Sequence, residues 1–368
     1  MKHNQQFDRI LFELNKGNPL ILSDNENKFN ILFTATETIN ENTLNFHKKF
    51  SNSFPNILLS PERCKTLNIK TDNCCSLTIN LKWTINQIFD LAFGNSSNTH
   101  IKLNGVIEEK NKLMYLSLKI LKKCKLLPSG IFSIINNSQK VPIDQLAIKN
   151  KIFYLNVSEI DKILDTKKTS VEIITRAKLP IKKTKNAEII VFKYNNEPKD
   201  YFCILIGRVN QKNSTGLIPT VRIHSQCVTG DIFHSLKCDC GEQLNKSLDI
   251  MVKNEEGIII YLPQEGRDIG LINKIRAYKL QEDGLDTVDA NLTLGFRDDE
   301  RSYDVAVSIL KKLNFKTINL ISNNPNKIKK LNEDGLKILN VIKLKIEPNE
   351  INKNYINTKK NRSNHIFD

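Results

Sequence analysis

The chain has 368 residues, of which 40% are hydrophobic and 26% charged, and this composition is typical of a globular protein with two domains. The formal net charge is +15, but the lysines are spread along the whole length and only 7% of the residues are aromatic. Because a nucleic-acid-binding surface gathers basic and aromatic residues, we attribute the charge mainly to a solvated surface and secondly to an anionic small substrate, and we expect no nucleic-acid partner.

We find no membrane-spanning segment and no signal peptide in the sequence. No apolar run approaches the ~20 residues of a membrane-spanning helix, and the opening run, MKHNQQFDRI, lacks the apolar stretch of a signal peptide. We therefore expect a cytoplasmic protein that does not bind a membrane. The eight cysteines are scattered, so in a reducing compartment we expect them to be free or metal-bound.

From the start of the chain to about residue 165, short apolar runs alternate with helical stretches. Residues 19–24 and 30–36 are predicted to be strands. Residues 117–135 are predicted to form a helix that ends before Pro128, followed by a strand. A polar, basic stretch that contains a proline, residues 165–187, is predicted to be the linker between two domains.

Beyond the linker the same alternation continues. Residues 257–263 are predicted to be a buried strand, because consecutive apolar residues follow a glycine, and residues 271–283 a helix that ends at Gly284. The other predicted elements are a hairpin over 188–196 and 202–210, a helix over 303–314, a strand over 317–322 and a helix over 326–335 capped by Gly335. The fold class predicted is α+β (mixed α/β), with two domains, 1–170 and 175–368, each a mixed sheet with packed helices.

Three cysteines, Cys227, Cys238 and Cys240, lie in the run RIHSQCVTGDIFHSLKCDCGEQL. They supply three soft ligands and no fourth, and zinc is the usual metal for such ligands. A structural zinc site normally has four protein ligands, whereas three leave a position for water, whose pKa zinc lowers to about 7. The spacing therefore predicts a hydrolase that uses zinc-bound hydroxide.

Two alternatives to this site remain open from the spacing alone. His224 or His234 could be a fourth ligand, which would make the site purely structural. The cysteines could also be unrelated core thiols, since free cysteine is often buried. The C-D-C pair argues against the second alternative, because two such close positions would rarely both need a small buried side chain.

Other polar clusters occur where strands and helices meet. Gln264 to Arg267 follow a predicted strand and open a helix, where Gly266 allows a close backbone approach and Arg267 can clamp a phosphate; the alternative is a plain capped turn. The remaining clusters are Asp298 to Arg301, in a position typical of helix capping, Ser322 to Lys327 after a strand, and Arg222 with His224 on one face of the strand that leads to Cys227. Together they predict a zinc ion beside a basic, phosphate-sized pocket.

Four long motifs now carry a resemblance. RIHSQCVTGDIFHSLKCDCGEQL, YLPQEGRDIGLINKIRAYKLQEDGLDTVDANLTLGF, DDERSYDVA and LISNNPNK stand in the order found in GTP cyclohydrolase II, and the chain resembles that family over roughly residues 175–368. The closing run NKNYINTKKNRSNH is similar to the family's C-terminal signature. The resemblance implies that the guanine imidazole ring of GTP is opened, with release of formate and pyrophosphate, to give 2,5-diamino-6-ribosylamino-4(3H)-pyrimidinone 5′-phosphate, the first committed intermediate of riboflavin.

The resemblance also implies roles for individual residues. Cys227, Cys238 and Cys240 would hold zinc, and the zinc-bound hydroxide would attack carbon 8 of the guanine. A magnesium ion would bind the triphosphate of GTP. The protein would be a homodimer. The positions that match GTP contacts are Arg222, His224, Ser225, Gln226, Gln243, Glu265, Gly266, Arg267, Thr287, Ser322 and Lys327. Those that match catalytic positions are Asp299, a proton acceptor, Arg301, a nucleophile toward the α-phosphorus, and Tyr278, which takes part in the ring chemistry.

One of these roles has a physical alternative, and three positions depart from the family. A guanidinium is a poor nucleophile unless a base removes a proton, so Arg301 could instead clamp the phosphates electrostatically. The departures are Gln226 where the family usually has glutamate, Lys237 in place of arginine and Ser322 in place of threonine. Gln226 lacks the negative charge that glutamate would place beside a zinc ligand. This difference concerns the efficiency of the enzyme more than its identity, although it also leaves open an inactive homologue that acts as a scaffold.

The first domain faintly resembles 3,4-dihydroxy-2-butanone 4-phosphate synthase, through FDRILFELNKGNPLILSD, NILFTATE and LKILKKCKLLPSGIFSII. The acidic magnesium-binding loop of that family aligns with residues 25–30, where Lys28 and Asn30 replace acids. Its histidine-containing motif aligns with residues 112–116, which hold neither histidine nor acid. We therefore predict an inactive domain kept for folding, dimerisation or regulation. The alternatives are an active second enzyme and, for the whole chain, a zinc-stabilised nucleic-acid-binding protein.

Overall fold

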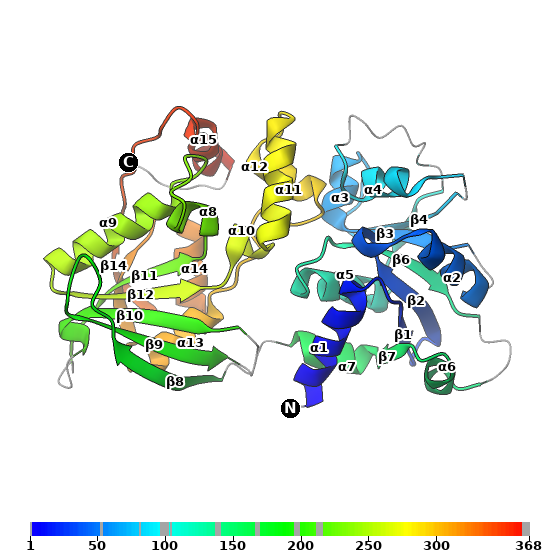
Figure 1. Cartoon of the computed structure of the whole chain (residues 1–368), viewed down its shortest axis with the longest axis horizontal. Helices are drawn as coiled ribbons and strands as arrows, with labels where there is room; N and C mark the ends of the chain where they lie inside the picture. Colours follow the sequence, from blue (N-terminus) through cyan, green and yellow to red (C-terminus); the bar gives the residue numbers. More distant parts are fainter. Residues whose placement is uncertain are drawn as a thin grey trace. The chain divides into compact units, whose positions relative to one another are not determined.

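The computed structural model describes residues 2–51, 54–80, 82–95, 103, 105–136, 141–165, 170–194, 199–210 and 216–362 (Figure 1). The chain divides into two compact units. The first comprises Met1–Asp165 and Ile272–Asp299, and the second comprises Thr166–Leu271 and Glu300–Asp368. The boundaries inferred from sequence kept residues 272–299 with the second half, whereas the structure places them with the first unit.

The first unit is built on a mixed sheet. Within the described residues its strand order is β5-β4-β3-β6-β2-β1-β7, and every neighbouring pair is antiparallel except β1 and β7, which are parallel. The strands are β1 (Leu20–Asp24), β2 (Phe29–Ala35), β3 (Asn56–Leu59), β4 (Cys74–Thr78), β5 (Ile107–Glu109), β6 (Ser129–Ile134) and β7 (Phe153–Asn156).

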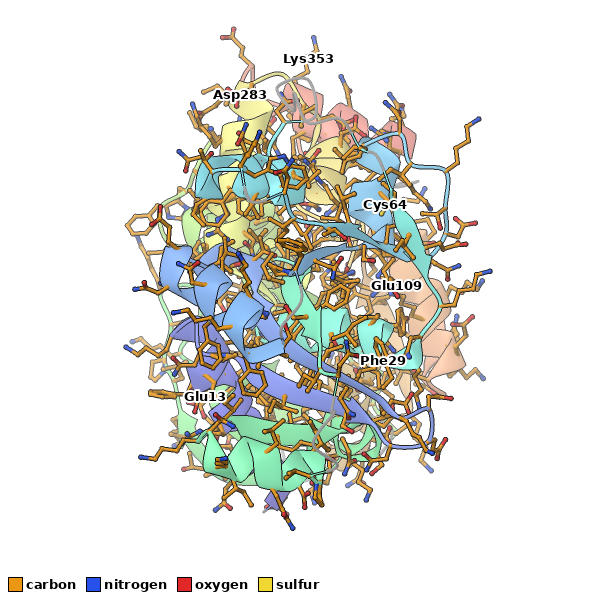
Figure 2. All side chains as sticks on the ribbon, turned by 90° about the vertical axis from the view of Figure 1, so that its right-hand side faces the viewer. Glu13, Phe29, Cys64, Glu109, Asp283 and Lys353 are labelled. Carbon is orange, nitrogen blue, oxygen red and sulfur yellow. The ribbon has the colours of Figure 1, made fainter. Side chains whose placement is uncertain are left out.

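Helices cover both faces of this sheet, because alternate residues of a strand point to opposite sides. Leu58 of β3 joins the apolar cluster that α1, α5 and α7 cover, and its neighbours Ile57 and Leu59 join the cluster under α3 and α4, where Cys64 is fully buried (Figure 2). The helices are α1 (Lys2–Asn15), α2 (Glu41–Ser51), α3 (Pro61–Thr66), α4 (Ile85–Phe93), α5 (Lys112–Lys123), α6 (Ile143–Lys149), α7 (Val157–Leu164), α11 (Leu271–Glu282), α12 (Thr287–Thr293) and the short 3₁₀ helix η1 (Thr36–Thr38).

The second unit contains another mixed sheet. Its order in the described residues is β14-β13-β11-β12-β10-β9-β8; β14, β13, β11 and β12 run parallel, and β12, β10, β9 and β8 antiparallel. The strands are β8 (Val171–Lys178), β9 (Ala187–Tyr194), β10 (Tyr201–Gly207), β11 (Thr220–Ser225), β12 (Glu256–Leu262), β13 (Thr317–Ile321) and β14 (Lys337–Ile342). Parallel strands end at the same edge, so the segments after β11, β12 and β13 are brought together.

Helices also lie on both faces of the second sheet. Met251 of α9 packs with Ile259 of β12 on one face, and Ile309 of α13 packs with Ile258 on the other. The helices are α8 (Val228–Asp231), α9 (Cys240–Lys253), α10 (Glu265–Asp268), α13 (Asp304–Lys312), α14 (Pro325–Glu333), α15 (Lys353–Arg362) and the 3₁₀ helix η3 (Arg208–Asn210). The mixed α/β class predicted from the sequence is confirmed.

The predicted linker over residues 165–187 is wrong in its central part. Residues 166–169 lie outside the described residues, but Val171–Lys178 form β8, the last strand of the second sheet. After Val171 every residue of β8 is exposed, so the strand lacks the alternation of apolar and polar residues that would identify it.

None of the helices in the described part of the chain combines the length and the apolar character needed to cross a lipid bilayer.

Candidate metal centre

The three cysteine sulfurs of the predicted site lie together in the second unit. All three Sγ atoms are within 4.8 Å of one another, and those of Cys227 and Cys238 are 3.7 Å apart. Sulfurs that bind one zinc ion at about 2.3 Å in a tetrahedron are separated by about 3.8 Å. Among the described residues, no histidine or carboxylate joins this group, and His234 is exposed. The donor set therefore fits a zinc ion with three protein ligands.

The end of one strand and the start of one helix place these sulfurs. Cys227 follows β11, and Cys240 is the first residue of α9. Gly230 of α8 lies against them: a Cβ atom there would be 2.8 Å from the Cys238 sulfur and 3.0 Å from the Cys227 sulfur. Only glycine leaves room for the sulfurs to converge, although the sequence analysis did not single this residue out.

The charge state of the thiols supports the same donor set. Hydrogen bonding to Cys227 is the largest cause that raises the pKa of Cys238 and of Cys240 when the thiols have only one another as partners, and burial adds to it. A divalent cation reverses this effect, because it favours the thiolate form. The cluster is therefore stable as neutral thiols or as thiolates around a cation.

Asp231 is a functional candidate that the sequence analysis missed. Its carboxylate accepts hydrogen bonds from the backbone N–H of Cys227 at 3.0 Å, from the Tyr261 hydroxyl at 2.9 Å and from Nε2 of His224 at 3.1 Å. The side chain thus ties the first cysteine to two neighbouring strands. Its position one residue after Gly230, within the motif, was the available signal.

His224 is held in one tautomer by this contact. A carboxylate only accepts hydrogen bonds, so Nε2 carries the proton and Nδ1 is left as an acceptor. The side chain is 3% exposed, and Nδ1 has no hydrogen-bond partner among the described residues. Burial, and then the nearby Arg222 charge, lower the pKa of His224, so the ring is neutral at pH 7.

Arg222 lies on the same face of β11 and is also buried. Its guanidinium donates to Oε1 of Gln243 and, at 3.3 Å, to the Ile321 carbonyl, and Nε has no partner among the described residues. Gln243 in turn donates to Asp239 at 2.6 Å. Burial lowers the pKa of Arg222, while Asp239 raises it. The structure therefore brings the predicted residues Arg222 and Gln243 together beside the cysteines.

Lys327 and Arg301 lie around one aromatic ring. Nζ of Lys327 is 5.0 Å from the centre of the Tyr303 ring, and the Arg301 guanidinium is 5.9 Å from the same point. Lys327 also donates to the Ile223 carbonyl at 2.9 Å, which joins the start of α14 to β11. Ser322 accepts from the backbone N–H of Asn324 at 3.1 Å. Nζ of Lys330 is also 5.9 Å from the ring centre, so three cations are gathered around Tyr303.

The turn from Gln264 to Arg267 does not open a regular helix, and that prediction is wrong. Gly266 and Arg267 have positive φ angles of 62° and 60°, and the regular helix α11 begins only at Leu271. Glu265 is 7% exposed, and its carboxylate accepts from the Val228 backbone N–H at 2.7 Å. This turn therefore supports α8 directly after Cys227.

The other predicted residues are distributed over both units. Ser225 donates to Gln264 at 3.4 Å, and the backbone of Gln226 donates to Leu262 at 2.8 Å, at the end of β11. Tyr278, Thr287 and Asp299 belong to the segment Ile272–Asp299 of the first unit. There the Tyr278 ring lies 5.7 Å from Nζ of Lys274, and Gln281 donates to Thr287 at 3.5 Å.

The two altered synthase motifs form ordinary local structure in the first unit. Residues 25–28 make the turn between β1 and β2, where Asn27 donates to Asp24 through its backbone and side chain at 3.2 and 2.8 Å. Lys28 has a φ of 52°, and Lys112, at the start of α5, forms an ion pair with Asp161. The carboxylate of Asp24 is therefore bonded to the Asn27 amides, and that of Asp161 to the Lys112 ammonium.

Comparison with known proteins gives consistent matches. A family model for GTP cyclohydrolase II matches residues 172–343. The chain is 47% identical over 197 residues to GTP cyclohydrolase-2 of Picrophilus torridus, covering 54% of this chain and 100% of the relative. It is 32% identical over 401 aligned residues to riboflavin biosynthesis protein RibBA of Staphylococcus haemolyticus, covering 98% of this chain and 100% of the relative. A solved two-domain 3,4-dihydroxy-2-butanone 4-phosphate synthase from A. baumannii covers 91% of this chain and 99% of its own, at 15% identity and with a TM-score of 0.35.

Proposed function

Since the chain belongs to the GTP cyclohydrolase II family, we propose that it opens the imidazole ring of GTP in the first committed step of riboflavin biosynthesis. The products are formate, pyrophosphate and 2,5-diamino-6-ribosylamino-4(3H)-pyrimidinone 5′-phosphate. The observation that supports this function best is the convergence of Cys227, Cys238 and Cys240 without a fourth side-chain ligand among the described residues. Such a site leaves a metal position for reactants.

The cysteine cluster fits zinc in number, softness and spacing of its donors. Bound there, zinc would supply Lewis-acid activation of the water that attacks carbon 8 of the purine. Cys227, Cys238 and Cys240 would hold the ion as thiolates, and Asp231 keeps Cys227 in place through its backbone N–H.

Within the part of the chain that the structure describes, His224 and Arg222 each keep one hydrogen-bonding atom without a partner. Nδ1 of neutral His224 can accept a proton or a hydrogen bond, and Nε of Arg222 can donate one. Both side chains are buried, so these polar atoms carry a desolvation cost that a polar substrate offsets. We propose that His224 and Arg222 orient the guanine base and the attacking water.

The cations around Tyr303 are suited to the triphosphate. Lys327, Lys330 and Arg301 place three positive charges near one ring, and a magnesium ion would share the remaining phosphate charge. An arginine held by a ring and flanked by a lysine fits a phosphate clamp, which is the role we assign to Arg301. We further propose a homodimer and a cytoplasmic location, as the family resemblance implies.

The first unit is proposed to lack synthase activity. Its loop over residues 25–30 carries Lys28 and Asn30 where the resemblance expects acids that bind a divalent cation, and residues 112–116 hold neither histidine nor acid. Purified protein given ribulose 5-phosphate and magnesium should form no dihydroxybutanone phosphate. Detection of that product would show an active second enzyme.

Product analysis tests the cyclohydrolase proposal. The full chain is incubated with GTP and magnesium, formate and pyrophosphate are quantified, and zinc is measured on the same sample. We expect both products in equal amounts, about one zinc per chain, and loss of turnover with a chelator that is reversed by added zinc. Salt-sensitive RNA or DNA binding without GTP turnover would instead favour a zinc-stabilised nucleic-acid-binding protein.

A further inference from the structure

Asp239 is a buried carboxylate inside the cysteine motif, and its role is not explained by the metal centre alone. It stands between two of the cysteines, is 0% exposed and directly precedes α9. An aspartate at that position normally accepts hydrogen bonds from backbone N–H groups of the first helical turn. In the described residues 239–243 the Asp239 side chain makes no such capping bond. Because a buried charge is costly without partners, its side-chain contacts in the site are informative.

One of these partners is the side chain of Gln243, one turn further along α9. Nε2 of Gln243 donates to Oδ2 of Asp239 at 2.6 Å, and its Oε1 accepts from the guanidinium of Arg222 on β11. The backbone N–H of Gln243 donates to the Asp239 carbonyl at 3.0 Å, and residues four apart in this way share one face of a helix. The three side chains form a hydrogen-bonded relay that begins within the cysteine motif and ends at a residue of the proposed substrate site.

The chemistry of its two ends fixes the direction of this relay. A guanidinium only donates hydrogen bonds, so the atom of Gln243 that faces Arg222 must be the amide oxygen. The amide nitrogen then faces Asp239, whose ionised carboxylate only accepts. Gln243 therefore cannot flip its amide without losing both bonds.

The relay holds Arg222 in one orientation. The Arg222 side chain is 6% exposed; NH2 donates to Gln243, NH1 donates to the Ile321 carbonyl at 3.3 Å, and Nε keeps no partner among the described residues. Burial lowers the pKa of Arg222, and Asp239 is the strongest of the influences that raise it. The protein thus holds two nitrogens of the guanidinium, leaves the third for a bound molecule, and balances the buried charge with Asp239.

We propose that Asp239 is a positioning residue for GTP binding, because through Gln243 it fixes the orientation in which Nε of Arg222 is left for the substrate. This inference rests on the proposed function, in which Arg222 orients the guanine base. It gives Gln243 a task other than direct contact with GTP, since the amide transmits the position of the Asp239 carboxylate to Arg222. The segment that carries two of the zinc ligands then also sets a substrate-binding side chain on β11.

Asp239→Asn in the full-length chain tests the relay. The new amide has nearly the same shape but no charge, and it can face Gln243 with its oxygen or its nitrogen, so the orientation of Gln243 is no longer fixed. We expect the Kd for GTP, measured by calorimetry without magnesium, to rise by about tenfold, and kcat/KM for formate release to fall by a similar factor. Zinc content should equal that of the wild type.

A charge swap makes the test sharper. Gln243→Glu places a second carboxylate against Asp239, so GTP binding should weaken more than in Asp239→Asn. When Gln243→Glu is combined with Asp239→Asn, the glutamate can accept from both Arg222 and the new amide. This double variant should therefore bind GTP better than Gln243→Glu alone, with a Kd within about tenfold of the wild-type value. A lost direct contact between Gln243 and GTP would not be recovered in this way.

Asp249→Asn is the matched control. Asp249 lies on the same helix, is 64% exposed and pairs with Lys183, so this variant should keep wild-type GTP affinity, turnover and zinc. If Asp239→Asn does not fold, Gln243→Met removes both side-chain bonds of the relay without altering the cysteine motif. It should weaken GTP binding to a similar extent and keep the zinc, and unchanged affinity would contradict the relay.

The outcomes separate this inference from the proposed function. Wild-type protein that binds GTP but releases no formate overturns the proposed function, and the GTP affinities of the variants still decide the positioning role. Wild-type protein that does not bind GTP overturns both. Asp239→Asn with wild-type affinity and turnover overturns the positioning role alone, as does a double variant that binds GTP no better than Gln243→Glu. Loss of zinc from Asp239→Asn also overturns it, because the carboxylate would then serve the metal centre.

Discussion

Each unit contains a group of three cysteines, and the two groups differ in geometry. In the second unit the sulfurs of Cys227, Cys238 and Cys240 converge within 4.8 Å. In the first unit Cys64 and Cys75 lie in one apolar cluster and Cys74 in another, on the opposite face of the sheet. Adjacent residues of a strand point to opposite faces, so Cys74 and Cys75 cannot share a metal ion.

The surroundings of the two groups differ as well. Burial raises the pKa of Cys74 to about 12 and that of Cys64 further, which makes these thiols inert core residues. Around the second group stand a carboxylate, a neutral imidazole and a guanidinium, with Gly230 leaving space for the sulfurs. A cysteine pair close in sequence is therefore a metal site only where the backbone turns the sulfurs to one point.

The largest expected effect separates the two groups directly. Cys238→Ala should lose the bound zinc and reduce formate release by about a hundredfold or more, because the remaining ligands cannot hold the ion. Cys75→Ala should keep both and lose only thermal stability, through a small cavity. Zinc analysis and a formate assay on the two variants check this. Zinc retained by Cys238→Ala would mean that the metal is bound elsewhere.

A second change tests the space between the sulfurs. Gly230→Ala places a Cβ atom 2.8 Å from the Cys238 sulfur, so the ligands must move apart. We expect zinc affinity and turnover to fall by about tenfold to a hundredfold. Competition with a chromogenic chelator measures the affinity. Gly105→Ala, at an open position with a φ of +74°, is the control for backbone strain and should leave the metal untouched.

A third change removes the carboxylate next to the cysteines. Asp231→Asn weakens the hold on Cys227 and allows the amide to donate toward His224, so we expect kcat to fall by about tenfold and the pH optimum to shift. Tyr261→Phe removes one of the donors to Asp231 and should have a smaller effect. A variant with unchanged pH profile and rate would exclude His224 orientation as the task of Asp231.

The smallest effect at neutral pH concerns a buried histidine of the first unit. His47 bonds Thr34 and Ser133 at 3.0 and 3.2 Å, and burial lowers its pKa from 6.5 to about 3. The unfolded chain therefore binds this proton more readily, so stability is highest above pH 6.5 and is lost as the pH falls toward 3, by at most about 1.4 kcal/mol per pH unit.

Denaturant unfolding at several pH values, with hydrogen exchange to identify the unit that opens, checks this expectation. His47→Gln should flatten the dependence on pH in the first unit. The exposed His234 offers a control, since His234→Gln should leave the dependence unchanged. An unaltered slope in His47→Gln would assign the acid sensitivity to other groups.

Sequence patterns were sufficient where the local residues determine the structure. The strand over residues 257–263 appears as β12, because its apolar run reflects real burial. The helix over 271–283 appears as α11, although the apolar residues Leu271, Ile272 and Ile275 are exposed and its buried residues include Asn273 and Lys274. The cysteine spacing likewise marked residues that the fold brings together. The mixed fold class followed from the same alternation.

Other features depend on long-range packing and left little trace in the sequence. The exposed strand β8 resembled a linker, and the positive φ of Arg267 replaced a predicted helix start. The attachment of α12 to Arg63 depends on carbonyl groups that every residue has, so no side-chain pattern could reveal it. Asp231 was missed because a lone aspartate has many ordinary roles.

Strand β8 has a consequence for the behaviour of the protein at high concentration. As the last strand of its sheet in the described structure, it presents a row of backbone groups to which another molecule could add a strand. Its pairing with β9 shifts register between Ile173 and Thr175, and charged side chains such as Glu172 and Arg176 follow along it. An irregular edge strand with charged side chains disfavours edge-to-edge aggregation. The same lack of an apolar pattern that made β8 difficult to predict from the sequence therefore helps to keep the protein soluble.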